Sequence, residues 1–165
     1  LEISCVCCQW VNSYKRLTPG FEAPSFATWA TVNRADLVRV PAYRQGKEES
    51  VRVEFRLPDP TCNPYLAFSV MLAAGLEGIE KEYPPVPPAE KDASLLSVEE
   101  RQAQGIAQLP GSLYEAVLLA ERSELLERAL GERTFRTFIE NKRIEWARFS
   151  SAVTDYELNR YLPIL

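Results

Sequence analysis

VRVEFRLPDPTCNPYLAF, residues 51–68, contains the point at which the chain changes from strand to helix. Hydrophobic and charged side chains alternate over residues 51–57, which is the pattern of a β-strand with two unlike faces. A Pro-Asp-Pro sequence then ends the alternation, because proline cannot donate a hydrogen bond to a ladder. Asn63 is a good helix N-cap and Pro64 a good first helical residue. We therefore expect a strand that ends near residue 57 and a helix that begins near residue 64.

The residues that precede this stretch are β-prone. Residues 25–29 form a short aromatic segment, residues 35–40 alternate up to a proline, and residues 43–50 have the polar character of a hairpin loop. We expect residues 1–24 to be irregular. Strands followed by helices favour an α+β fold, with a short antiparallel β segment followed by a helix-rich C-terminal region. Two or three strands make a thin sheet, whose neighbouring strands would have to come from elsewhere.

Helices are predicted for most of the chain after residue 63. Residues 65–79 are apolar on nearly every side, so we expect this helix to be buried. A proline-rich connector follows, with extended character. Ser97, Ser112 and Thr154 stand where helix N-caps are expected, and Gly131 is a good C-cap. The C-terminal half is therefore predicted to be a series of amphipathic helices.

Composition excludes several classes of protein. The net charge is −4 and the pI about 5.1, which argues against a nucleic-acid binder, because such proteins usually carry a basic face. No apolar run approaches the roughly 18–20 residues that span a bilayer, so we expect no membrane contact. The N-terminal sequence lacks the features of a signal peptide and an initiator Met. We expect a cytoplasmic protein, present here as a fragment or a processed form.

The chain has four cysteines and no histidine. The absence of histidine removes the commonest general base and the commonest metal ligand. The cysteines lack the paired spacing of a zinc site, and a chain of this size needs no disulfide framework. We expect reduced thiols, and any acid–base or metal chemistry must rest on carboxylates, arginines and lysines.

The charged face of the predicted strand is the first candidate site. Arg52, Glu54 and Arg56 share one face because side chains alternate along a strand. Such a face is most often simply solvated. Arginine, however, binds carboxylate and phosphate in a bidentate manner. A carboxylate among arginines also suits Mg²⁺, which takes oxygen ligands and bridges phosphates.

Five motifs in this chain resemble, in the same order, the C-terminal motifs of type I glutamine synthetases. They are NSYKRLTPGFEAP (12–24), NRADLVRVP (33–41), VRVEFRLPDPTCNPYLAF (51–68), LPGSLYEAV (109–117) and KRIEWARFSSAVTDYELNRYL (142–162). Several motifs in register are far more specific than any one of them. The resemblance identifies residues 12–165 as the C-terminal portion of a glutamine synthetase catalytic domain and leaves residues 1–11 unassigned.

The resemblance implies a reaction and a role for each charged residue. The family joins ammonia to glutamate with ATP through a γ-glutamyl phosphate, with Mg²⁺ or Mn²⁺, and forms homo-oligomers. The implied roles are glutamate binding for Arg16 and Arg56, a closing flap that accepts a proton from ammonium for Glu22, phosphoryl-group stabilisation and ATP binding for Arg34 and Arg39, ATP phosphate binding for Arg52, and metal ligation for Glu54.

The resemblance also implies that much of the enzyme is missing. The family's N-terminal domain and the first half of its catalytic domain, with most metal ligands, have no counterpart here. One glutamate cannot hold two or three divalent ions, so we expect the chain to be inactive alone. Two alternatives stay open: ligation of a polyamine or another amine in place of ammonia, and a non-catalytic scaffold that docks through its C-terminal helices and the sequence NRYLPIL.

Overall fold

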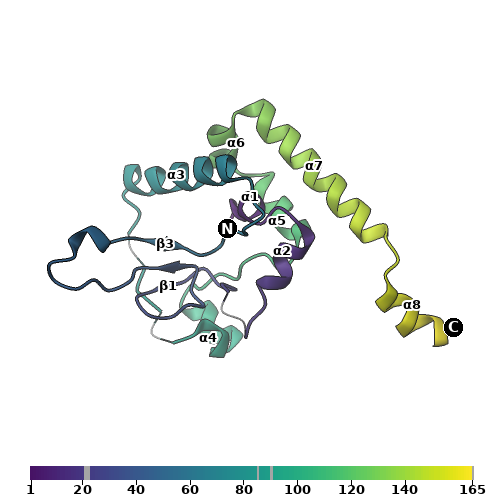
Figure 1. Cartoon of the computed structure of the whole chain (residues 1–165), viewed down its shortest axis with the longest axis horizontal. Coiled ribbons are helices and arrows are strands. Elements are labelled where there is room, and N and C mark those ends of the chain that lie inside the picture. The colour runs from purple at the N-terminus through teal and green to yellow at the C-terminus, as the bar shows by residue number, and fades with distance from the viewer. Residues whose placement is uncertain (21–22, 85, 90, 165) are drawn as a thin grey trace.

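The computed structural model describes residues 1–20, 23–84, 86–89 and 91–164 (Figure 1). It confirms the α+β class, with a small sheet and a helix-rich C-terminal region, and adds two short helices before the sheet. The strands are β1 (Trp29–Ala30), β2 (Val38–Arg39) and β3 (Glu54–Phe55). The helices are α1 (Ser4–Cys7), α2 (Val11–Arg16), α3 (Pro64–Glu80), α4 (Val98–Ala103), α5 (Leu113–Ala120), α6 (Glu124–Leu130), α7 (Glu132–Ser151) and α8 (Asp155–Tyr161), with 3₁₀ turns η1 (Glu48–Ser50), η2 (Ala93–Leu95) and η3 (Leu162–Ile164). No described helix is both long and apolar enough to cross a membrane.

The sheet has the order β1-β2-β3 and is mixed. The β2–β3 pair is antiparallel, as expected, and its register sets Val38 opposite Phe55 and Arg39 opposite Glu54. The β1–β2 pair is parallel, which the sequence did not indicate. Each strand pairs over only two residues, far fewer than the alternating segments suggest, because a residue with strand character becomes part of a ladder only where another strand lies beside it.

The N-terminal residues form the centre of the core, where an irregular segment was expected. All four residues of α1, Ser4–Cys7, are completely buried, and the helix contacts both α3 and α5. Around it lie side chains from α5, α6 and α7, including Leu113, Leu126 and Phe138. A four-residue helix shows no periodicity in a sequence, so composition alone could not separate α1 from a loop.

The expected helix starts are present, and only the capping box predicted at Ser112 differs in detail. Ser97 caps α4 and Thr154 caps α8, each in a reciprocal capping box with the glutamate three residues later. Ser112 accepts a hydrogen bond from the amide of Glu115, while the Glu115 carboxylate accepts one from the amide of Gly111. Gly131, with φ of 76°, ends α6 and begins α7. These local contacts satisfy the amide groups that every helix start leaves free.

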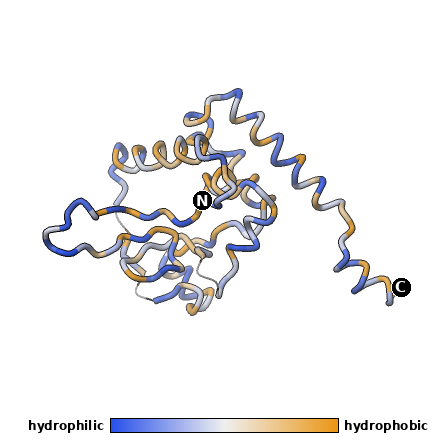
Figure 2. The backbone as a smooth tube through the Cα atoms, in the orientation of Figure 1, coloured by the Kyte–Doolittle hydropathy of each residue, from blue (hydrophilic) through white to orange (hydrophobic). Residues whose placement is uncertain are grey.

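The expectation that the helix over residues 65–79 is buried was wrong for this chain. Only Ala67 and Val70 of α3 are buried. Figure 2 shows that hydrophobic residues predominate along α3, and large ones among them, such as Phe68 and Leu72, are exposed. The helix therefore has the sequence of a buried element but only one covered face.

The contrast between buried and exposed leucines on α5 gives a test of the core. Leu113 has no exposed surface, whereas Leu119 is 40% exposed. We expect Leu113→Ala to lower the free energy of unfolding by about 2–5 kcal/mol, because it leaves a cavity. Leu119→Ala should change it by less than about 0.5 kcal/mol. Urea denaturation of both variants measures the difference, and equal losses would contradict this core.

The four free cysteines give a second test. Burial raises the pKa of Cys5 to about 12 and that of Cys8 to about 11, and it also raises the pKa of Cys7. At pH 8 less than about one in a thousand Cys8 thiols is then ionised, and only the thiolate reacts. We expect an aromatic disulfide reagent to modify at most the partly exposed Cys62 in the native chain, and all four thiols after denaturation. Rapid native modification of more than one thiol would contradict the burial of α1.

Candidate functional site

The antiparallel pairing of β2 with β3 builds a compact charged cluster. Because Arg39 stands opposite Glu54, its Nη1 donates to Glu54 Oε2 at 3.0 Å. Arg52 lies two residues before Glu54 on the same face, and its Nε and Nη2 donate to Oε1 at 2.9 and 2.6 Å. Arg52 and Glu54 therefore lie together on one face, as the alternation of the sequence predicted. Arg39, from the neighbouring strand, is an additional partner of Glu54.

Glu54 is a charged acceptor with part of its capacity still free. Hydrogen bonds from Arg52 hold the pKa of Glu54 below its usual range, and Arg39 acts in the same direction. A carboxylate offers about four lone-pair positions. The three hydrogen bonds from the two arginines leave a position on Oε2 for one further partner.

Arg56 and Arg34 are joined at the end of the same two strands. Arg56 Nε donates to the backbone oxygen of Arg34 at 2.9 Å, and the amide of Arg56 donates to the oxygen of Leu37. The loop that carries Arg34 is therefore held against the end of β3. Arg56 follows Glu54 by two residues in the chain, and its hydrogen bond links Arg34 to the end of β3.

Arg16 reaches this region from the last turn of α2. Its Nη2 donates to the backbone oxygen of Leu57, one residue beyond Arg56. Among the described residues, the Nε atoms of Arg16 and Arg39 are buried without a hydrogen-bond partner. A buried donor without an acceptor costs about 1–3 kcal/mol. The two unsatisfied donors belong to different elements, Arg16 to α2 and Arg39 to β2, and each keeps the capacity to donate to an anionic group such as a carboxylate or a phosphate.

Glu22, the predicted proton acceptor, lies outside the described residues. The structure describes the turn residues Pro19 and Gly20 before it and Ala23 after it. Its predicted role therefore stays a prediction.

Asp36 is a buried charge that the sequence analysis gave no role. Its side chain is 1% exposed, and burial raises its pKa. Hydrogen bonds to Thr28 and Asn33 oppose that rise, whereas Asp92 adds to it. Among the described residues, its Oδ2 has no hydrogen-bond partner. The only sequence signal for the burial of Asp36 was its position in the alternating segment 35–40, because that alternation predicts a side chain that faces the interior.

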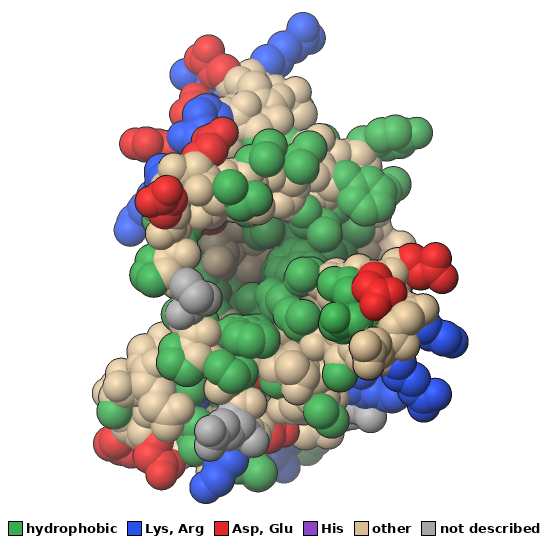
Figure 3. Space-filling model, turned by 90° about the vertical axis from the view of Figure 1, so that its left-hand side faces the viewer, with side chains coloured by type: hydrophobic (Ala, Val, Ile, Leu, Met, Phe, Trp, Pro, Cys, Tyr) green, Lys and Arg blue, Asp and Glu red, His purple; other side chains and the backbone are tan. Residues whose placement is uncertain are grey.

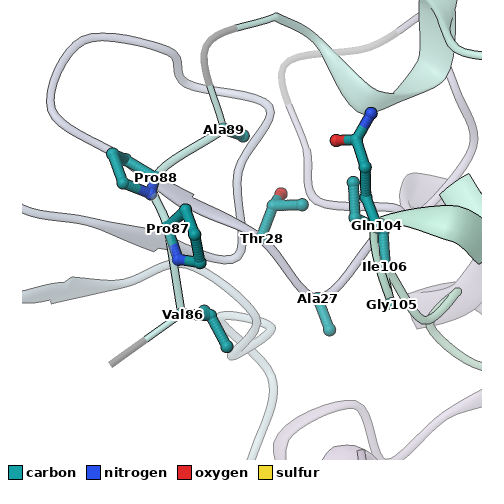
Figure 4. Close-up of a pocket in the computed structure, with 9 residues that line it drawn as sticks. All are labelled: Ala27, Thr28, Val86, Pro87, Pro88, Ala89, Gln104, Gly105 and Ile106. Carbon is teal, nitrogen blue, oxygen red and sulfur yellow. The ribbon is translucent and has the colours of Figure 1, made fainter. Parts of the chain in front are cut away.

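The pocket drawn in Figure 4 is not lined by any residue of the charged cluster. A cavity of about 280 Å³ lies between the connector residues Val86–Ala89 and Gln104–Ile106, with Ala27 and Thr28 between them (Figure 4). Its lining has no charged side chain. Among the residues that the structure describes, no group of three or more Cys, Asp or Glu side chains is placed to hold a metal ion.

Comparisons with known proteins agree on one family. The family model described as "Glutamine synthetase, catalytic domain" matches residues 1–161. A glutamine synthetase of Mycobacterium tuberculosis is 55% identical over 163 residues, which is 99% of this chain and 36% of the relative. One of Thermus thermophilus is 45% identical over 92% of this chain and 33% of its own length. A solved GmaS/ADP complex superposes with a TM-score of 0.80 at 34% identity, over 98% of this chain and 36% of that one.

The Glu54 cluster gives a test by titration. Because Arg52 supplies two of the three hydrogen bonds to Glu54, Arg52→Met should raise the pKa of Glu54 toward its ordinary value. Arg39→Met, which removes one hydrogen bond, should raise it less. The ¹³C shift of the Glu54 carboxyl followed against pH measures both changes, with the exposed Arg44→Met as a control. An unchanged titration in Arg52→Met would show that the cluster does not form.

Proposed function

The chain belongs to the glutamine synthetase family, and from that premise we propose that it is the C-terminal portion of the catalytic domain of an ATP-dependent glutamate–ammonia ligase. It spans about a third of the length of the relatives it matches. The observation that carries the proposal is the cluster of Arg39, Glu54 and Arg52, in which the Nε of Arg39 has no hydrogen-bond partner among the described residues. We also propose a cytoplasmic homo-oligomer, as the family resemblance implies.

The arginines are proposed to bind the two anionic substrates. Arg16 and Arg56 lie together at the end of β3 and are assigned to the carboxylate of glutamate. Arg34, Arg39 and Arg52 are assigned to the phosphates of ATP and to the phosphoryl group in transit. Fixed cations of this kind stabilise the charge that spreads over the phosphoryl oxygens in the transition state.

Glu54 is proposed as one ligand of a divalent metal, Mg²⁺ or Mn²⁺. The donor set fits in kind, because Glu54 is ionised and keeps an open position on Oε2. It does not fit in number, because such ions take about six oxygen ligands and usually several carboxylates or phosphates. Further ligands would have to come from polypeptide outside this chain. When bound, the metal would neutralise phosphate charge.

The proposed reaction has two steps. The γ-carboxylate of glutamate attacks the γ-phosphorus of ATP, the bond to the bridging oxygen breaks, and ADP leaves. Glu22 is assigned to accept a proton from ammonium. The ammonia so formed attacks the carbonyl carbon of γ-glutamyl phosphate and expels hydrogen phosphate, which takes the proton that the nitrogen loses. Arg34 and Arg39 hold the phosphate during both steps, and a closed flap excludes the water that would otherwise hydrolyse the intermediate.

A scaffold function has one observation in its favour. The described residues of α8 and η3 are all exposed, and the two contact each other at the far end of α7 (Figure 1). An arm of this kind suits assembly, as well as or instead of catalysis. Calorimetric titration with Mg²⁺ and ATP separates the scaffold function from the ligase function, because a scaffold alone would bind no nucleotide.

The proposed function is tested in a chimaera. The matched C-terminal region of the Mycobacterium tuberculosis relative is replaced by this chain, and phosphate release is measured with glutamate, ATP and either ammonia or a polyamine. We expect ammonia-dependent turnover, and we expect Glu54→Gln to lower it by about a hundredfold or more, because one ligand and its charge are lost. Glu49→Gln, an exposed residue of η1, is the matched control. Full turnover in Glu54→Gln would refute the metal role, and turnover with the polyamine alone would favour the other acceptor.

A further inference from the structure

Five large hydrophobic side chains form one exposed stripe along α3. Tyr65, Phe68, Leu72, Leu76 and Ile79 follow at intervals of three, four, four and three residues. At 100° per residue these positions fall within an arc of about 80°, so they lie on one side of the helix. Their exposed fractions are 83%, 69%, 65%, 48% and 74%. We call these five residues the α3 stripe.

The opposite side of α3 is already packed. Ala67 and Val70 are buried there, and α3 contacts α6 and α1. The Glu77 carboxylate pairs with Lys81 and with Arg128 of α6. The apolar stripe is therefore not the side that holds α3 to the body of the chain. A helix that is apolar on both sides is typical of one that is sandwiched between two layers.

A second exposed apolar surface precedes β3. Val51 and Val53 are 56% and 68% exposed, and they share a strand face with Phe55, which packs against the core. Figure 3 shows hydrophobic side chains gathered around a hollow on one face of the molecule. In the described part of the chain, β1 and β3 are both edge strands with two-residue pairings. Apolar patches and short open sheet edges are both features that another polypeptide normally covers.

We propose that the α3 stripe is the docking surface for the catalytic-domain polypeptide that the relatives carry outside the matched region. Close to two thirds of the Mycobacterium tuberculosis relative lies outside the match, so a polypeptide of sufficient size exists in the family. The stripe has no charged member, so the docking face must be apolar, with aliphatic or aromatic side chains opposite Phe68, Leu72 and Leu76. The same polypeptide can also pair with the edge strands β1 and β3. A partner that contacted only α3 could not do so.

This inference rests on the proposed function for the identity of the partner, but its test needs no turnover. The tagged 165-residue chain is co-expressed with the segment of the Mycobacterium tuberculosis relative that lies outside the match, and the purified material is analysed by sedimentation velocity. We expect a one-to-one complex. A complex that forms but has no ligase activity refutes the proposed function and leaves the docking surface intact.

Introducing negative charge into the stripe separates specific docking from general adhesion. We expect Leu72→Glu combined with Leu76→Glu to lower the co-purified partner at least tenfold, because two carboxylates would be buried without a counter-charge. Leu95→Glu is the control, because Leu95 is 81% exposed in η2, outside the stripe. Far-UV circular dichroism should show both variants folded, since neither alters a buried residue. If the double variant fails to fold, Phe68→Gln, which adds no charge, replaces it and should still weaken the complex.

Three results would overturn the proposal. The first is a wild-type chain that recovers no partner, and the second is a stripe variant that recovers as much partner as Leu95→Glu does. The third is a stable homodimer of the chain that Leu72→Glu dissociates while the co-expressed segment stays unbound. That last result would assign the stripe to a second copy of this chain.

Discussion

The complete burial of α1 is the constraint on which the rest of the structure depends. Ser4–Cys7 lie at the centre of the core, and their backbone holds the surrounding elements in place. The oxygen of Cys7 accepts the amide of Asp59, and the oxygen of Cys8 accepts the hydroxyl of Tyr14 at 2.8 Å. The turn after β3 and the helix α2 are thus attached to the same few residues. The position of Arg16 beside Leu57 follows from these two attachments.

The charged cluster contributes little to stability, which is consistent with the binding role proposed for it. Glu54 is a quarter exposed and Arg52 half exposed, and ion pairs of that kind contribute little to folding. Arg16 and Arg39, moreover, each leave a buried Nε without an acceptor in the described part of the chain. A fold selected only for stability would not keep such donors unsatisfied. Glu54 restrains the guanidinium groups of Arg39 and Arg52, which would otherwise repel each other.

Local features of the fold were predictable from the sequence, and features that depend on distant residues were not. Ser112 and Thr154 cap helices because a side chain and an amide three residues apart suffice. The Arg52–Glu54 pair follows likewise from strand alternation. Arg39 joins that pair only through the register of two strands, which no local pattern states. The burial of α1 and the parallel β1–β2 pair arise from packing between segments far apart in the chain, and Asp36 became notable only once its surroundings were known.

The helix α3 shows that a sequence can indicate an environment that a chain does not itself provide. Its composition predicted burial on all sides, and the structure buries one side and exposes Phe68 and Leu72 on the other. Large apolar side chains on both sides of a helix are expected where both sides are covered, because exposing such side chains to water is unfavourable. The proposed metal ligand Glu54 is in a similar position, because among the described residues no further carboxylates gather beside it to hold an ion. If both proposals hold, one further layer of polypeptide would cover the exposed side of α3 and supply the remaining ligands beside Glu54.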